Sequence, residues 1–242
     1  MIIEPRKWLT WATFPDCSDL RWRFNWIYLQ AACDKFLLLY VRQPFTTKVV
    51  NLRLSPESIA DSMPAKARYQ VRRARKDALT ISYHQDIKII IELFNLTAQA
   101  KGLIGVSKKT FTTKQRYLVS QIDAEGTGPL AAHFYLLDES GKRVYLSYNC
   151  SAYRKFSGGR LRSLCGRANK LLFLEDMYYF KSLGYDAYDF GGYDPDSTDP
   201  SRQSVNIFKD DLPGEVVMQY NYYPLWYWLF KRAYNQIQKW RN

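Results

Sequence analysis

Hydrophobic and polar positions from residue 79 onward follow two patterns along the chain. Alternation of apolar and polar residues predicts strands, and apolar residues three or four positions apart predict helices. The predicted strands are residues 79–84, 129–137, 143–149, 185–190 and 215–220. The predicted helices are residues 86–100, 112–123, 161–183 and 205–210, with another from about residue 224. This order is typical of a mixed α/β sheet covered by helices.

The segment before residue 79 has a less regular pattern. Two strands are expected at residues 35–42 and 48–54, with a loop at a Gln-Pro pair between them. Ser55 followed by Pro56 is typical of a helix start, because serine caps the first turn and proline suits the first helical position. Pro64 is expected to restart or kink that helix. The first 35 residues are rich in tryptophan and permit no assignment.

Composition and charge indicate a folded protein with an anionic partner. Hydrophobic residues make up 47% of the 242 residues and aromatic residues 16%, which excludes a disordered chain. The formal net charge is +12. Residues 66–76 and residues 154–170 each hold six basic side chains and no acidic one. A basic excess of this kind favours a phosphate-rich ligand, a nucleic acid or an acidic membrane surface.

Cysteine spacing, histidine number and hydropathy indicate the redox state of the thiols, the kind of site and the location of the protein. The four cysteines lie far apart without metal-type spacing, so we expect reduced and mostly buried thiols. His84 and His133 are too few and too separated to indicate a metal site. We find no signal-peptide pattern and no stretch of about 20 apolar residues. These features predict a cytoplasmic protein, with peripheral contact with the inner face of the membrane as an open alternative.

Three segments carry motifs that occur together in one family. Residues 66–78 (KARYQVRRARKDA) form an Arg/Tyr-rich helix, and residues 185–193 (YDAYDFGGY) place a Gly-Gly pair at a strand end. Residues 207–215 contain Phe-Lys followed by Pro-Gly-Glu, where the family has Phe-Gly-Gly before the glutamate. In this order and at these separations, the segments resemble the FemAB-like transferases. That family includes the enzymes that attach amino acids to peptidoglycan precursors.

The resemblance implies the α/β fold of the GNAT superfamily. In that fold the central strands of a curved mixed sheet splay to admit a thioester or ester donor. We expect one GNAT-like acyltransferase domain at residues 79–242, which ends in an aromatic helix. Residues 1–78 are then a truncated N-terminal GNAT-like extension.

The same resemblance implies a donor site at the start of the long helix. Backbone amides there hold the donor's pyrophosphate in GNAT folds, because a helix N-terminus attracts anions. Residues 163–168 match the Gly and Ala of the pattern (Gln/Arg)-x-x-Gly-x-(Gly/Ala), with Ser163 in the first place. The predicted donor-binding residues are Arg160, Arg162, Gly166, Arg167, Ala168 and Asn169. The alternative is a solvated basic helix start.

Three residues are candidates for catalysis. The family position of Lys209 implies an ammonium near the scissile carbonyl, where it stabilises the developing oxyanion. Asp189 either accepts the amine proton or caps the Gly-Gly turn. Glu175 shares a helix face with apolar residues and is expected to point toward the sheet as a base, with a surface carboxylate as the alternative.

Five further residues are candidates for acceptor binding. Gly191 and Gly192 suit a positive φ or a close backbone approach. Tyr148 and Tyr193 can donate hydrogen bonds near the reacting groups, and Arg72 belongs to the first of the three motifs.

The resulting hypothesis is an acyl- or aminoacyl-transferase without a permanently bound cofactor. Acyl-CoA or aminoacyl-tRNA is the expected co-substrate. An amine or a hydroxyl is the expected acceptor, on a sugar nucleotide or lipid-linked sugar of cell-envelope or surface-polysaccharide synthesis. One alternative is an N-acyl amino acid synthase that uses an acyl carrier protein. Another is a non-enzymatic RNA-binding module that uses the basic clusters and interleaved aromatics.

Residues 222–240 leave two interpretations open. They combine Trp, Tyr and Leu with Lys231, Arg232 and Lys239. Such a helix suits either the surface of an anionic membrane or a terminal position that closes the core.

Overall fold

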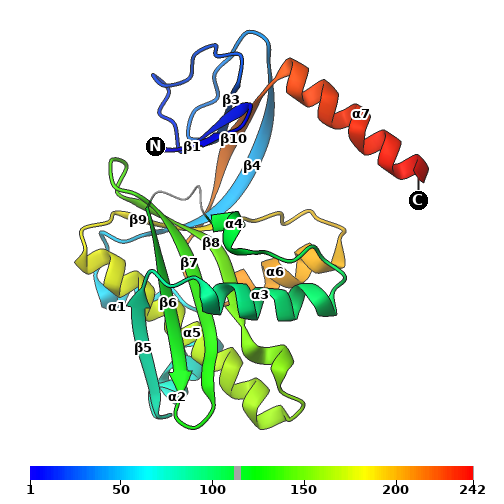
Figure 1. Cartoon of the computed structure of the whole chain (residues 1–242). Coiled ribbons are helices and arrows are strands. Elements are labelled where there is room, and N and C mark those ends of the chain that lie inside the picture. The colour runs from blue at the N-terminus through cyan, green and yellow to red at the C-terminus, as the bar shows by residue number, and fades with distance from the viewer. Residues whose placement is uncertain (112–115, 242) are drawn as a thin grey trace. The chain divides into compact units, whose positions relative to one another are not determined.

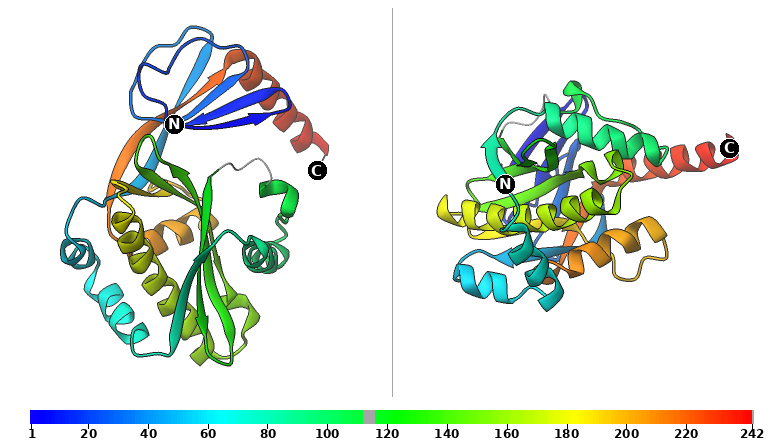
Figure 2. Two further views of the ribbon diagram at one scale, coloured as in Figure 1. Left: turned by 60° about the vertical axis from the view of Figure 1, so that its left-hand side comes forward. Right: turned by 90° about the horizontal axis from the view of Figure 1, so that it is seen from below.

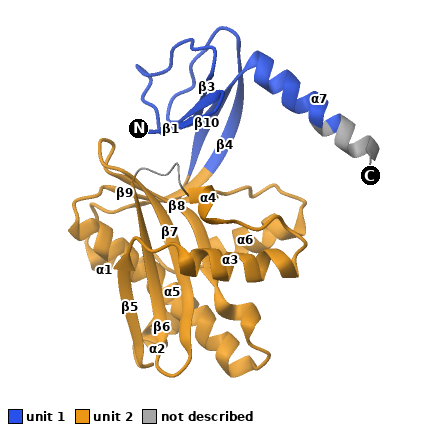
Figure 3. Cartoon of the chain, in the orientation of Figure 1, with its two compact units in different colours: residues 1–46, 217–242 blue, residues 47–216 orange. Residues whose placement is uncertain are grey.

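The computed structural model describes residues 1–111 and 116–241. The chain forms two compact units, one of residues 1–46 and 217–242 and the other of residues 47–216 (Figure 3). These limits differ from the expected division at residue 78, which falls inside the second unit.

The first unit is built on a small sheet and one helix (Figure 1). Its strands lie in the order β1-β2-β3-β10, and only β2 and β3 run parallel to each other. The strands are β1 (Ile2–Arg6), β2 (Leu9–Thr13), β3 (Trp26–Ala31) and β10 (Glu215–Pro224), and α7 (Leu225–Arg241) follows. Its core contains Ala12, Leu20, Tyr28, Ala31, Leu37 and Tyr222.

Cys17 and Cys33 correct the expectation of four reduced thiols. They form a disulfide in the first unit, with their Cα atoms 5.8 Å apart. Cys150 and Cys165 are free and buried, as expected. Sequence spacing does not show pairing, because two cysteines bond only where the fold brings their Cβ atoms together.

The second unit contains a larger mixed sheet. Its strand order is β4-β9-β8-β7-β6-β5, in which β8 and β9 run parallel and the other pairs with an assigned register run antiparallel. The strands are β4 (Tyr40–Asn51), β5 (Leu79–His84), β6 (Tyr117–Ala124), β7 (Gly128–Asp138), β8 (Arg143–Ser151) and β9 (Ala187–Gly192). Only the last five residues of β4 belong to this unit.

Helices cover both faces of this sheet. They are α1 (Pro56–Asp61), α2 (Ala65–Ala74), α3 (Lys88–Ala100), α4 (Lys108–Phe111), α5 (Gly159–Ser182) and α6 (Pro200–Asp210), with a 3₁₀ turn at Ala152–Lys155. The helix α3 contacts β7 and β8, and α5 contacts β6 and β7 from the opposite face (Figure 2). Neighbouring residues of β7 show the two faces: His133 stacks on Phe173 of α5, whereas Phe134 packs on Phe111 of α4.

Local signals explain where several elements begin and end. Ser55 caps α1 by accepting a hydrogen bond from the amide of Ser58, as its position before Pro56 predicts. The helix α5 ends at Ser182, and Gly184, which has φ +82°, follows two residues later. The amides of Gly184 and Tyr185 bond back to the last turn of that helix, a common glycine-dependent helix end. These boundaries confirm the pattern-based predictions.

Three predicted elements are wrong in type or extent. Residues 117–124 form β6 rather than the end of a helix, and residues 112–115 lie outside the described residues. The predicted pair of strands at 35–42 and 48–54 is one strand, β4. Leu39, with φ +60°, turns the chain just before β4 begins. The helix α6 begins at Pro200, five residues earlier than expected.

Candidate active site

A cavity lies where two parallel strands of the second unit part. The register of β8 and β9 runs from Arg143 opposite Ala187 to Tyr145 opposite Asp189. Both strands continue beyond this point, and residues of both line a cavity of about 400 Å³. Its lining is Lys101, Leu146, Ser147, Asn149, Phe173, Phe190, Ser201, Ser204, Val205, Phe208, Lys209 and Leu212. None of these described residues carries a carboxylate or an imidazole.

Lys209 is the buried cation of this cavity. It lies in the last turn of α6, and its Nζ donates hydrogen bonds to the carbonyl oxygens of Gly191 (3.0 Å) and Gly192 (2.7 Å). Burial is the main cause that lowers the pKa of Lys209 to about 8; the charge of Asp189 opposes this shift and the charge of Lys48 adds to it. An ammonium carries three N–H groups, so one remains beyond the two that the carbonyls accept.

Asp189 caps the Gly-Gly turn. Its fully buried carboxylate accepts hydrogen bonds from the amide of Gly191 (2.7 Å) and from the Thr47 hydroxyl, and it forms an ion pair with Arg143. Of the two roles that the sequence left open, the contacts favour the cap. Gly191 has φ +72°, a conformation that side chains disfavour, so this turn depends on glycine.

A second buried lysine, which the sequence analysis did not select, supports the end of α6. Lys48 on β4 donates from Nζ to the carbonyl oxygens of Lys209 (2.7 Å) and Leu212 (2.8 Å). Burial lowers the pKa of Lys48. Its cationic group thereby links β4 to the last turn of α6 and to the residue two positions after that helix, and a cation at a helix C-terminus is favourable.

Gly214 keeps the same region closely packed. At φ +112°, an added Cβ would lie 2.8 Å from the carbonyl oxygen of Val49 on β4. The glycine of the third motif is therefore required by packing between the chain after α6 and β4.

Asp176, rather than Glu175, points from α5 into the sheet. Glu175 is half-buried and pairs with Arg75 at 2.8 Å, so the expected inward carboxylate is a surface one. Asp176 is fully buried, and its Oδ2 contacts His133 Nδ1 (2.7 Å), the Ser120 hydroxyl (2.8 Å) and a tyrosine hydroxyl. The carboxylate of α5 that faces the sheet is therefore that of Asp176, one position after Glu175.

A chain of hydrogen bonds leads from this buried cluster to the cavity. His133 Nε2 lies 2.7 Å from the Asn169 Oδ1, and Asn169 Nδ2 donates to Asn149 Oδ1 (3.2 Å), which belongs to a cavity-lining residue. On the other side, the Tyr135 hydroxyl donates to Asp176 at 2.5 Å. Burial, and then the charge of Asp176, raises the pKa of Tyr135, so its phenol stays neutral.

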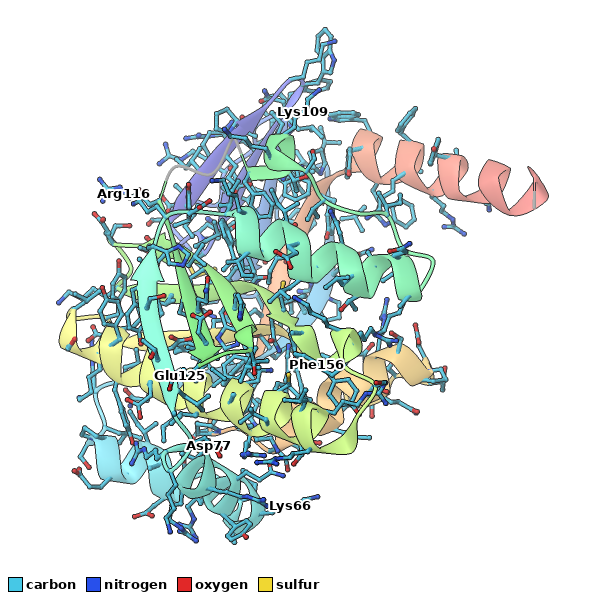
Figure 4. All side chains as sticks on the ribbon, turned by 60° about the horizontal axis from the view of Figure 1, so that its bottom comes forward. Lys66, Asp77, Lys109, Arg116, Glu125 and Phe156 are labelled. Carbon is cyan, nitrogen blue, oxygen red and sulfur yellow. A yellow bond between two sulfur atoms is a disulfide. The ribbon has the colours of Figure 1, made fainter. Side chains whose placement is uncertain are left out.

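The expected donor-binding arginines surround the start of α5. Arg160 is exposed in the first turn. Arg162 donates from Nε to the carbonyl oxygen of Phe156 at 2.7 Å, in the segment just before the helix (Figure 4). Arg167 forms a bidentate ion pair with Asp77 at 2.6 and 3.0 Å. This pairing also lowers the pKa of Asp77.

Residues 163–168, the segment expected to bind the donor's pyrophosphate, lie one turn inside α5. The backbone amides of Gly166 and Ala168 are therefore bonded to the preceding turn of the helix. Asn169 belongs to the buried chain of hydrogen bonds instead. The helix amides that lack an intrahelical acceptor belong to the first turn, which begins at Gly159.

The expected acceptor-binding residues are only partly brought together. Gly191 and Gly192 accept the bonds of Lys209, and the Tyr193 hydroxyl donates to Asp210 at 2.8 Å, which raises the Tyr193 pKa. Tyr148 instead packs among aromatic rings of α3, α4 and β7, on the other face of the sheet from α5. Arg72 is exposed on α2 and does not line the cavity.

Comparison with solved structures identifies the fold. The chain is similar to FemX, with a TM-score of 0.58 and 13% identity over 77% of this chain and 63% of FemX. It is also similar to the C-terminal (DUF2156) domain of an Agrobacterium fabrum protein assigned as a lysylphosphatidylglycerol synthetase. That TM-score is 0.56, at 15% identity, over 91% of this chain and 78% of the other. The chain has the FemX-type fold. No family model and no curated protein matches the sequence.

The FemX-type fold agrees with the mixed α/β sheet covered by helices that the sequence predicts. In this fold, the second and third motifs meet at one place: the Gly-Gly carbonyls at the end of β9 hold the lysine at the end of α6. The chain spans slightly less than two thirds of FemX.

In the site, the buried ammonium of Lys209 lies beside apolar side chains. Phe173, Phe190 and Phe208 line the cavity next to Lys209. A cation in such a poorly hydrated place interacts strongly with negative charge that develops nearby.

Proposed function

We propose that this protein is an acyl- or aminoacyl-transferase. The observation that carries the proposal is Lys209, a buried lysine with a pKa of about 8 at a cavity between two parting strands. The cavity has room for a thioester or ester group beside that cation. The FemX-type fold agrees with this function, since one protein of similar fold is assigned as making lysylphosphatidylglycerol.

The proposed reaction is a direct transfer without a covalent enzyme intermediate. The acceptor nitrogen attacks the donor carbonyl carbon, and a C–N bond forms as the carbonyl oxygen becomes an oxyanion. Lys209 stabilises that oxyanion. The C–S or C–O bond of the donor then breaks, the leaving thiolate or alkoxide takes a proton, and the acceptor nitrogen releases one to water. No carboxylate or imidazole lines the described cavity, so solvent takes the role of the proton acceptor.

The proposed donor is acyl-CoA or aminoacyl-tRNA, and the proposed acceptor is an amine or hydroxyl of a sugar nucleotide or lipid-linked sugar in the cytoplasm. The first turn of α5 offers backbone amides together with Arg160 and Arg162, an arrangement that suits a donor phosphate. Lys101 adds a further cation at the cavity.

Native mass spectrometry with coenzyme A, acetyl-CoA and charged transfer RNA tests the donor class. We expect the wild-type protein to form a complex with one of these donors. The double variant Arg160→Ala/Arg162→Ala is expected to bind that donor about five- to tenfold more weakly, because each arginine supplies a charge-assisted contact. Arg53→Ala is the matched control, since Arg53 is exposed and pairs with Asp186.

The outcomes separate the alternatives. Binding of a coenzyme A species supports the acyl-CoA donor, and binding of transfer RNA alone supports the aminoacyl donor. If neither binds, the proposed donor site at α5 is wrong, and an acyl carrier protein becomes the next donor to test.

The pKa of Lys209 predicts how transfer depends on pH. The ammonium is the active form, so kcat is expected to fall as pH rises through about 8, well below the ordinary lysine value of 10.5. Lys209→Arg keeps its charge throughout this range, because the guanidinium pKa exceeds about 12. Its kcat, although lower, is expected to lack that alkaline fall.

Steady-state rates across this range, at saturating donor and acceptor, provide the measurement. A wild-type kcat that stays constant from pH about 8 to the ordinary value of 10.5 would contradict the role of the ammonium.

A further inference from the structure

The first unit carries an apolar surface that the transfer reaction does not use. A cavity of about 280 Å³ is lined by Trp22, Arg23, Phe24, Leu39, Tyr40, Pro224, Leu225, Trp226 and Leu229. We call these residues the aromatic patch. Phe24 is 62% exposed, Trp22 54% and Leu229 52%. Large apolar side chains that cluster with this exposure mark an interaction surface, because soluble proteins rarely leave such groups together in water.

The aromatic patch is a fixed surface. The indole N–H of Trp226 donates to the carbonyl oxygen of Phe24 at 2.7 Å, and their rings stack 5.2 Å apart. The amide of Leu225 donates to the carbonyl oxygen of Leu39 at 2.8 Å. Three stretches that are distant in sequence are thereby held together. The apolar groups are therefore presented in a set arrangement, and binding requires little ordering of the chain.

Arg23 is part of the patch, and Lys231 and Arg232 follow its last residue, Leu229, on α7. Arg23 lies over the ring of Trp26 at 3.9 Å, Lys231 over Tyr223 at 5.5 Å, and Arg232 over Trp228 at 5.3 Å. Residues 20–26 and 222–234 contain no acidic residue. The surface thus combines aromatic rings, leucines and positive charge, which is the composition of segments that lie at a membrane interface.

We propose that the aromatic patch binds the surface of an anionic phospholipid bilayer. Trp22, Phe24 and Leu229 enter the boundary between headgroups and acyl chains, while Arg23, Lys231 and Arg232 contact lipid phosphates. None of the helices within residues 1–111 and 116–241 is long and apolar enough to cross a membrane, which agrees with binding at the surface. A second copy of the chain fits less well, because it would bring the same positive charge to the interface.

This inference is independent of the proposed transferase activity. Lipid binding needs only residues of the first unit, whereas the proposed catalysis needs Lys209 in the second. An experiment that contradicts one of the two proposals therefore leaves the other unaffected.

Co-sedimentation of the full chain with vesicles tests the inference. We expect binding to vesicles of phosphatidylcholine mixed with phosphatidylglycerol, and weaker binding when salt is added or when phosphatidylglycerol is left out. Leu229→Ser is expected to weaken the affinity by about tenfold, because one large apolar side chain no longer leaves water. Lys231→Glu with Arg232→Glu is expected to weaken it by at least about tenfold, because two attractive charges become repulsive.

Ile104→Ser is the matched control, because Ile104 is 94% exposed in the second unit and lies outside the patch. Its vesicle affinity is expected to equal that of the wild type. The thermal unfolding of each variant shows whether it is folded. Three results would overturn the inference: no binding to anionic vesicles, equal binding by the folded patch variants, or a stable dimer that Leu229→Ser dissociates.

Discussion

Lys209→Met is expected to lower the kcat of transfer by about 10²- to 10³-fold, the usual cost of losing one group that stabilises an oxyanion. Methionine keeps the length of the side chain but has no N–H to offer the developing charge. Because Lys209 acts on the transition state, the affinity for the donor is expected to change little. Steady-state kinetics together with donor binding by native mass spectrometry separate the two effects.

Lys66→Met serves as the control for this prediction. Lys66 is exposed on α2 and does not line the cavity (Figure 4). Its kcat is expected to equal that of the wild type. A wild-type kcat for Lys209→Met would show that the Lys209 ammonium does not stabilise the oxyanion. A variant that loses donor binding and kcat together would show that Lys209 holds the donor in its ground state.

Asp176→Ala is expected to lower the free energy of unfolding by about 3 kcal/mol or more, because it leaves several buried hydrogen-bonding groups without their shared acceptor. His133, Ser120 and a tyrosine hydroxyl all direct hydrogen bonds to this carboxylate. Without it, these groups remain buried with no acceptor in that place. Urea denaturation followed by circular dichroism measures the loss.

Glu175→Ala is the matched control, because Glu175 is the neighbouring residue of the same helix. Its side chain is 32% exposed and makes one ion pair, with Arg75. Surface pairs of this kind contribute less than about 1 kcal/mol. Equal losses for the two variants would show that the buried network contributes little to stability. A larger loss for Glu175→Ala would reverse the assignment of which carboxylate faces the sheet.

The strands and helices with strong local signals could be predicted from sequence. The strand at 79–84 has an alternating pattern, and the glycine after the end of α5, Gly184, is a local stop signal. Residues 117–124 could not be assigned correctly from sequence. Val119 and Ile122 are three positions apart, as on a helix face, but both are buried in a strand with neighbours on each side. Pairing with β5 and β7 overrides that local pattern.

The candidate site was only partly visible in the sequence. Lys209 and the two glycines were found because motifs mark them. Lys48 was missed because it belongs to no motif and meets α6 only through the fold. The His133–Asp176 pair was missed because its members are 43 residues apart. Glu175 and Asp176 are adjacent on α5, and hydrophobic periodicity is too coarse to show which of the two carboxylates faces the sheet.

The division of the chain into units determines the order in which they can be completed during synthesis. Residues 47–216 emerge from the ribosome as one continuous stretch and contain all of the second unit. The first unit needs β10, which pairs with β3, and Tyr222, which lies in its core. Residues 1–46 are therefore made first and finished last. Until translation reaches β10, the apolar side chains of residues 1–46 have no complete core in which to pack. They are therefore exposed to aggregation during that time.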